Sequence, residues 1–230
     1  MESESDIKPK LVERYQGLVR INYDVQEEQH EDIDGTKRTI YIYRMLELSN
    51  VNMSVEELTT TLIYDKYDKA TQIKMVSDDY EKITLALFTA KCLIYAKKIL
   101  GIKPSLEDVK TEKLAEINKY DISSAVNSFT IGNTNLWLNR TLRGTLMRRL
   151  EAEKSSGVAE TTLWHGNKAL KLNVDKAITM LNAIEIYASK CYDVTASHKA
   201  KVEALNNIDA VKSYDYTVGY PESLAFNVVK

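Results

Sequence analysis

The chain has 230 residues, with 31 Lys and Arg against 33 Asp and Glu, and only 8 Gly and 3 Pro. This length can bury a substantial core, as one large domain or two smaller ones. The balanced charge removes the electrostatic argument for a nucleic-acid partner, because phosphate binding requires a basic surplus or patch. The scarcity of Gly and Pro favours long helices joined by short turns.

Cysteine use and hydropathy indicate a soluble protein that is made in a cytoplasm. Cys92 and Cys191 have no second Cys or His at metal-ligand spacing, so we expect both to be buried apolar residues. The polar start MESESDIKPK shows no secretory signal, and no long apolar run predicts a membrane span. We expect no cofactor, no metal, no nucleic acid and no membrane partner.

The beginning of the chain predicts a long β-hairpin. Residues 1–10 have the composition of a mobile polar arm. Alternating apolar and polar residues predict strands over 18–26 and 38–47, and the wide acidic loop between them ends in the turn pair Asp34-Gly35. A lone hairpin is marginal in water, so this one must pack on helices or on another chain.

Helix signals fill the rest of the first half. Ser54 begins the capping box SVEE and with it a short helix. A strongly apolar helical pattern runs from 77 to 100, where Gly101 ends it. The following Pro-Ser pair is the best candidate boundary. We therefore predict a hairpin and helical domain over 1–103 and a second domain over 104–230.

Two segments of the second half share one pattern, GNTNLWLN at 132–139 and GNKALKLN at 166–173. Each reads as a strand, a two-residue Gly-Asn turn, a second strand and an Asn that caps a helix. The Gly supplies a positive φ and the alternating Leu fill one face. The two hairpins could also pair into one four-stranded sheet. The predicted structural residues are Gly132, Asn133, Trp137, Trp164, Gly166 and Asn167, with both tryptophans buried as packing anchors.

A further helix, capped by Thr195, and an extended tail complete the predicted fold. The fold class is therefore α+β: an N-terminal β-hairpin plus helices, then two hairpin–helix (ββα) units, the further helix and the tail.

Aromatic residues at both ends are the predicted interaction residues. Tyr41 and Tyr43 lie on the face opposite Ile40 and Ile42, so a single core cannot cover both faces of that strand. The tail after Ser213 favours no helix, and we expect it to be a strap that docks on this chain or on a neighbour. A chain that lacks 1–17 and 214–230 is predicted to fold but not to self-associate. The predicted interaction residues are Tyr41, Tyr43, Tyr214, Tyr216, Tyr220 and Pro221.

No residue pattern predicts catalysis. His165 and His198 have no nucleophile or carboxylate partner in view, so we expect His165 to be exposed beside its turn and His198 to lie at the surface or at its boundary. The stretch EDIDG at 31–35 lacks the ligand spacing of a calcium loop, and the arginines between 140 and 149 indicate a solvated helix with ordinary ion pairs. Gly144 inside that helix predicts a close approach to its backbone, because Gly there costs about 1 kcal/mol against Ala. The common phosphate-loop, dinucleotide, serine-hydrolase and zinc-protease motifs do not occur.

Three stretches carry a resemblance to a known family: AVNSFTIGNTNLWLNRTLRGTL (125–146), the segment 160–205 beginning ETTLWHGN, and SYDYTVGYP (213–221). Over about 115–221 the chain resembles a phage and prophage family known only as a domain of unknown function, found in tail-associated and tail-fibre-region proteins. The first half looks, more loosely, like N-terminal regions of similar proteins in phages of Bacteroides-type hosts.

The resemblance implies a setting, a virion tail, and assigns no reaction. The leading hypothesis is a non-enzymatic phage structural protein, an adaptor in the tail or tail-fibre region that contacts other tail proteins and is present as a homo-oligomer or in many copies. Two alternatives stay open. One is a tail-fibre assembly factor that is absent from the mature virion, and the other is a hydrolase of surface glycan or peptidoglycan, which would need paired carboxylates.

Overall fold

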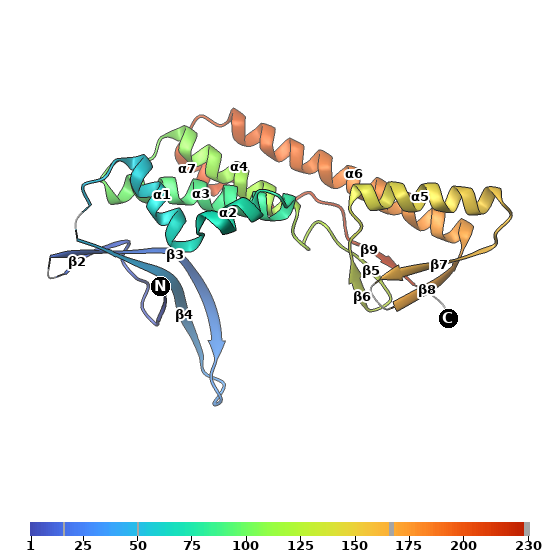
Figure 1. Cartoon of the computed structure of the whole chain (residues 1–230), viewed down its shortest axis with the longest axis horizontal. Helices are drawn as coiled ribbons and strands as arrows, with labels where there is room; N and C mark the ends of the chain where they lie inside the picture. The colour runs from blue at the N-terminus through green and yellow to red at the C-terminus, as the bar shows by residue number, and fades with distance from the viewer. Residues whose placement is uncertain (16, 50, 166–167, 228–230) are drawn as a thin grey trace. The chain divides into compact units, whose positions relative to one another are not determined.

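The computed structural model describes residues 1–15, 17–49, 51–165 and 168–227 (Figure 1). Over these residues it contains seven helices and nine strands in small sheets, which confirms the α+β class. None of the described helices is both long enough and apolar enough to cross a membrane. The chain forms two compact units, unit 1 over 1–119 and 202–214 and unit 2 over 120–201 and 215–230. We predicted two separate domains, 1–103 and 104–230. Whether each of them folds independently stays a prediction.

Unit 1 contains a four-stranded antiparallel sheet in the order β1-β4-β3-β2, together with helices. Its elements are β1 Glu2–Ser5, β2 Val12–Tyr15, β3 Leu18–Glu31, β4 Lys37–Leu48, α1 Val55–Lys66, α2 Lys69–Met75, α3 Asp79–Ile99, α4 Leu106–Asp121 (all but its last two residues) and α7 Ile208–Ser213. The predicted hairpin is confirmed as β3 and β4.

Two details of the predicted hairpin are wrong. The polar arm is not mobile over residues 2–5, because they pair with 41–44 of β4 and satisfy its backbone groups. The acidic stretch 27–31 is not loop, because β3 and β4 stay paired as far as Glu31 and Lys37. Side-chain charge does not prevent a strand from forming when both faces are open to water.

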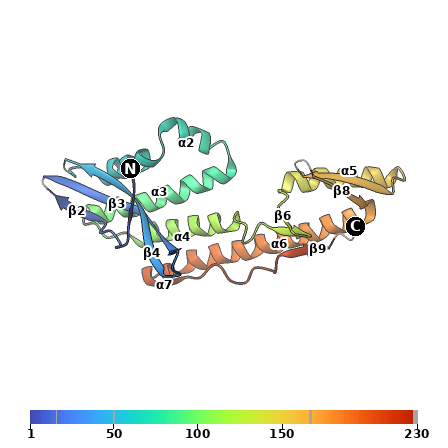
Figure 2. The ribbon, with the colours of Figure 1, turned by 90° about the horizontal axis from the view of Figure 1, so that it is seen from below.

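The core of unit 1 lies between the sheet and the helices α1 and α3. Its buried side chains are Val19, Ile21, Tyr23, Leu58, Leu62, Phe88, Cys92 and Ala96. Helix α4 runs antiparallel to α3, as Figure 2 shows. The two helices are joined by Lys97 to Asp108 at 2.5 Å and by Lys119 to the Thr84 hydroxyl at 2.6 Å.

Helix ends in unit 1 follow the local signals in the sequence. Ser54 and Glu57 form both hydrogen bonds of a capping box at the start of α1. The helix α3 ends at Ile99, and Gly101 has φ +72°, a left-handed conformation that suits glycine.

Unit 2 contains two small sheets and two helices. Its elements are β5 Phe129–Ile131, β6 Thr134–Leu136, α5 Arg140–Ser155, β7 Glu160–His165, β8 Lys168–Asn173, α6 Val174–Ala204 (up to residue 201) and β9 Leu224–Phe226. Both ββα units are present, with Asn139 and Asn173 accepting hydrogen bonds from backbone N–H groups at the helix starts. The hairpins do not pair with one another: β7 and β8 form a separate two-stranded sheet, and the tail strand β9 pairs in parallel with β5.

The predicted separate helix beginning at Thr195 is wrong, because α6 runs unbroken from Val174 to Ala204. No Gly or Pro interrupts this stretch. The Thr195 hydroxyl is buried and hydrogen-bonds to Asp121 Oδ1 at 2.6 Å instead of capping a helix start. A threonine whose hydroxyl has a tertiary partner can therefore sit inside a helix.

Two glycines of unit 2 have opposite roles. Gly132, in the turn with Asn133, has φ +57°, which confirms the predicted turn. The equivalent pair, Gly166 and Asn167, lies outside the described residues. Gly144 is exposed, and a Cβ built on it would meet no described atom within 4 Å, so no described part of this chain makes the predicted close approach to its backbone.

We expect Gly132→Val to lower the melting temperature and Gly144→Ala to raise it. A side chain in the left-handed region costs about 1–2 kcal/mol, and more when it is β-branched. Alanine in an exposed helix interior gains about 0.5–1 kcal/mol over glycine. Thermal denaturation followed by circular dichroism measures both. A Gly132→Val variant as stable as the parent would contradict the turn assignment.

Candidate functional site

A polar network fixes the base of the β3–β4 hairpin to α1. The Tyr23 hydroxyl donates to Asp65 Oδ2 at 2.6 Å, and Arg44 Nε donates to the same oxygen at 3.1 Å. Beside them, Lys66 Nζ donates to Asp24 Oδ2 at 2.6 Å. The charged side chains are largely shielded from water, where opposite charges attract more strongly than at the surface.

The same place is a bend in the strand. The register of β3 against β4 shifts between Tyr23 and Gln26, and Asp24 has φ +54°, the one described non-glycine residue with positive φ. Such strain persists only when the surroundings hold it, and here the Lys66 ion pair does so. The network therefore acts as a clamp that aims the rest of the hairpin.

Burial raises the pKa values of the hydroxyl in the clamp and of the thiol and hydroxyl at Cys92 and Tyr95. Burial raises the pKa of the Cys92 thiol to about 12 and that of the Tyr95 hydroxyl to about 12. Burial, together with the hydrogen bond to Asp65, also raises the pKa of Tyr23. Reactive thiols and hydroxyls need the opposite shift, so this arrangement stabilises structure.

Beyond the clamp the hairpin continues as a free ribbon, by which we mean residues 26–40. Every residue from 26 to 38 is exposed, although β3 and β4 stay paired. β2 pairs with β3 only over 18–21, and β1 pairs with β4 only over 41–44. Within the described residues, both outer edges of the ribbon thus have no strand beside them. Figure 1 shows the ribbon running away from the helices of unit 1.

An apolar groove lies between α1 and α3. It encloses about 780 Å³ and is lined by Val55, Ile63, Leu85, Ala86 and Leu93, with several threonines. Its only charged lining residues are Glu56 and Lys82. The largely apolar lining suits an apolar segment of a partner.

The C-terminal strap, residues 215–226, docks on unit 2 of its own chain. The rings of Tyr216 and Tyr220 both pack edge-on against Tyr120, with centroids 5.6 and 5.5 Å away. Phe226 packs against buried Phe129 at 5.9 Å. Of the two docking sites that the sequence left open for this tail, the structure shows the one on its own chain.

His198 is buried beneath the strap, so the predicted position at the surface or its boundary is wrong. It is 5% exposed, its Nε2 lies 2.9 Å from the Val218 carbonyl oxygen, and its ring packs against Tyr220. The Tyr220 hydroxyl also lies 2.9 Å from that of Thr195. Each polar group helps to hold the strap, and no local pattern predicts this because the partners lie 20 and 25 residues apart.

The basic helix α5 is not simply solvated. Arg143 is 8% exposed, and its Nε donates to Glu185 Oε2 at 2.5 Å while Nη1 donates to the Leu138 carbonyl at 2.7 Å. Its guanidinium also lies over the ring of Trp137, 5.5 Å from the centroid. Arg143 thus fixes the start of α5, contrary to the prediction for this helix.

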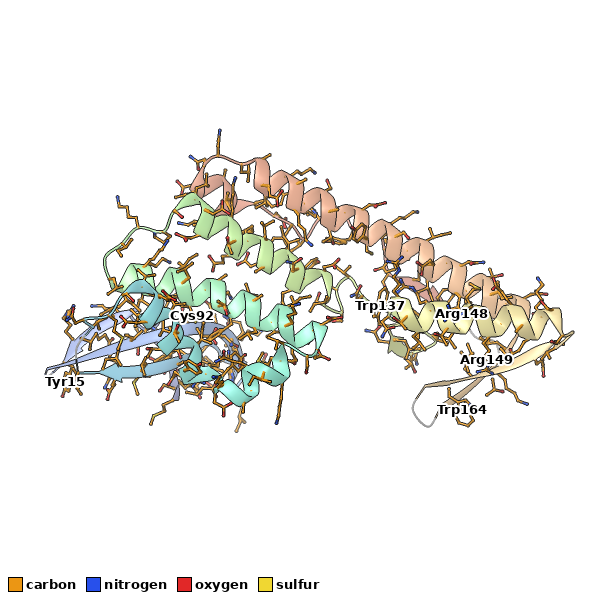
Figure 3. The ribbon with its side chains drawn as sticks, turned by 45° about the horizontal axis from the view of Figure 1, so that its top comes forward. Tyr15, Cys92, Trp137, Arg148, Arg149 and Trp164 are labelled. Atoms are coloured by element: carbon orange, nitrogen blue, oxygen red, sulfur yellow. The ribbon has the colours of Figure 1, made fainter. Side chains whose placement is uncertain are left out.

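The two tryptophans differ. Trp137 is partly buried in the core of unit 2, edge-on to Tyr187 at 6.3 Å. Trp164 is 68% exposed and its side chain points away from α5 (Figure 3), so its predicted burial is wrong. The reason is strand alternation: Thr161 and Leu163 occupy the inner face of β7, which leaves position 164 on the outer face.

The remaining predicted interaction residues are distributed over both units. Tyr41 and Tyr43 are partly buried and pair with Ser5 and Ser3 of β1. Tyr214 follows α7 in unit 1, and Pro221 lies in the strap, where it is partly buried. Whether they contact other proteins stays a prediction.

Among the residues that the structure describes, no three His, Cys, Asp or Glu side chains are grouped so that they could hold a metal ion. Comparisons with protein-family models, with curated proteins and with solved structures found no match to this chain. The most distinctive surface features are therefore the ribbon and the α1–α3 groove. The alternation in the sequence predicted the strands 18–26 and 38–47, but most of the ribbon, residues 27–37, was predicted as a loop.

Proposed function

We propose that this chain is a non-enzymatic structural protein that connects neighbouring protein subunits. The observation that supports this is the ribbon, a regular pair of strands with thirteen consecutive exposed residues, 26–38. Natural proteins usually shorten or cover such edges, because bare backbone N–H and C=O groups invite pairing with another chain. A clamp of partly buried ion pairs that aims the ribbon outward is consistent with a role in contact.

The setting we propose is the tail or tail-fibre region of a phage virion, with this chain as an adaptor in several copies. The support is the resemblance carried by 125–146, 160–205 and 213–221. It falls mainly in unit 2, whereas the ribbon belongs to unit 1. In this proposal unit 2 supplies the part shared with other tail proteins, and unit 1 supplies a contact of its own.

Quantitative mass spectrometry of purified particles from the encoding phage tests the proposal. We expect this chain in a fixed ratio to the major tail proteins, unchanged by further gradient purification. A host protein that falls with each step is the control for contamination. Presence in infected-cell lysate with loss from pure particles would reject the adaptor and favour the transient assembly factor.

A further inference from the structure

The two strands of the ribbon carry opposite charges. Residues 26–31 of β3 contain three Glu and no Lys or Arg, whereas 37–40 of β4 contain Lys37 and Arg38 and no acid. All five charged side chains are exposed. The outer edge of β3 is therefore the acidic edge of the ribbon, and the outer edge of β4 is the basic edge.

This separation decides which edges of two copies can meet. Strands in a sheet lie about 4.8 Å apart, and like charges directly opposite one another are destabilising. Two β3 edges would bring glutamates together, and two β4 edges would bring cations together. A β3 edge beside a β4 edge is favourable. An antiparallel register that places Glu28 opposite Lys37 of the next copy also places Glu27 opposite its Arg38.

The existing partners of these charges do not prevent such pairing. Lys37 lies 3.9 Å from Glu31, and Arg38 lies 3.4 Å from Asp32 and 3.5 Å from Asp6. These are long, exposed contacts that contribute little. Glu27 and Glu28 lie on the strand itself, where a neighbouring strand would add cross-strand partners on both sides.

We propose that the ribbons of successive copies of this chain pair edge to edge, the acidic β3 edge of one against the basic β4 edge of the next. The inference rests on the proposed structural role and names its partner as a second copy. Because the two contacting surfaces differ, the interface is heterologous, and repetition closes a ring or extends a filament. Backbone hydrogen bonds would hold the two edges together. The charges would decide that a β3 edge pairs with a β4 edge.

A competing explanation is that the charges only protect the edges from association. Charged residues on edge strands commonly do this. Charges of either sign protect an edge strand from association. Protection alone therefore predicts a monomer, and the chain should stay a monomer when the charges of β3 or β4 are reversed. Edge pairing predicts an assembly that depends on opposite signs, so the two explanations differ in measurable ways.

Sedimentation velocity on the full chain is the first test. We expect oligomers at low ionic strength whose dissociation rises with salt, because exposed charges are screened beyond about 10 Å at 0.1 M. A monomer across the accessible concentration range at low salt would overturn the proposal.

Two charge-reversed variants provide the decisive test. Glu27→Lys with Glu28→Lys makes both edges basic, and Lys37→Glu with Arg38→Glu makes both edges acidic. Each variant alone should associate at least ~10-fold more weakly than the parent, since two favourable pairs become unfavourable. An equimolar mixture should assemble again, with the two variants alternating. Circular dichroism melts establish that each variant is folded.

The matched control for the Glu27 and Glu28 variant is Glu151→Lys with Glu203→Lys, which changes the net charge by the same amount at exposed positions of α5 and α6. It should assemble like the parent. If each ribbon variant assembles like the parent, or if the mixture fails to recover, the edge-pairing proposal is wrong. A chain that assembles through its ribbon and yet is absent from particles would instead reject the proposed tail setting alone.

Discussion

A chain that ends at Ser213 is expected to lose the cooperative folding of unit 2. The truncation removes Phe226 from against Phe129, which is 1% exposed, and removes Tyr220 from its contacts with Tyr120 and His198. Loss of one Phe-sized side chain from a core costs about 3–5 kcal/mol, and the strap removes several partly buried side chains together. This loss is a large share of the roughly 5–15 kcal/mol by which a whole domain is stable.

Chemical denaturation with circular dichroism and intrinsic fluorescence measures this effect. In the truncated chain we expect unit 2 to unfold at a lower denaturant concentration than unit 1, or to show no cooperative transition. Phe226→Ala tests the same contact with the strap retained, and Glu222→Ala in the exposed part of the strap is its matched control. A truncated chain with the parent's midpoint would show that the strap contributes nothing to the core.

This expectation reverses part of what the sequence predicted for the shortened chain. An aromatic tail without helical propensity has the same local pattern whether it docks on its own chain or on a neighbour. Removing residues 1–17 also deletes β1 and β2, which pair with β4 and β3. A chain shortened at both ends therefore cannot separate loss of association from loss of folding.

The second large effect is expected at Trp137. Trp137→Ala should cost about 3 kcal/mol, the lower end of the range for a core tryptophan, because the ring contacts Tyr187 and lies under the guanidinium of Arg143. Trp164→Ala should change the stability by less than about 0.5 kcal/mol, as expected for an exposed side chain. The two substitutions form a matched pair, since each removes one tryptophan of the two in the chain.

Fluorescence of the two variants supplies an independent check. With Trp137 replaced, the remaining Trp164 should emit at longer wavelength and be readily quenched by iodide. With Trp164 replaced, the emission should be shifted to shorter wavelength and resist quenching. Equal quenching in the two variants would contradict the difference in burial.

Local features were predictable because each depends on residues within about four positions. The capping box at Ser54, the turn at Gly132 and the Asn caps of α5 and α6 each form from neighbouring backbone groups. The alternation that indicated β3 and β4 likewise needs no knowledge of what lies against them. The α+β class followed from these elements.

The tertiary structure alone decided which side chains are buried and by what. His198 is covered by a strap that begins about 17 residues later, and Thr195 stays inside α6 because Asp121, 74 positions earlier, accepts its hydrogen bond. Trp164 is exposed and Trp137 is partly buried, although each lies in or beside one of the two hairpins. Trp164 lies on the outer face of β7, because Thr161 and Leu163 occupy the inner face. Burial depends on contacts between segments that are distant in the sequence. The spacing of neighbouring residues does not determine the energy of those contacts.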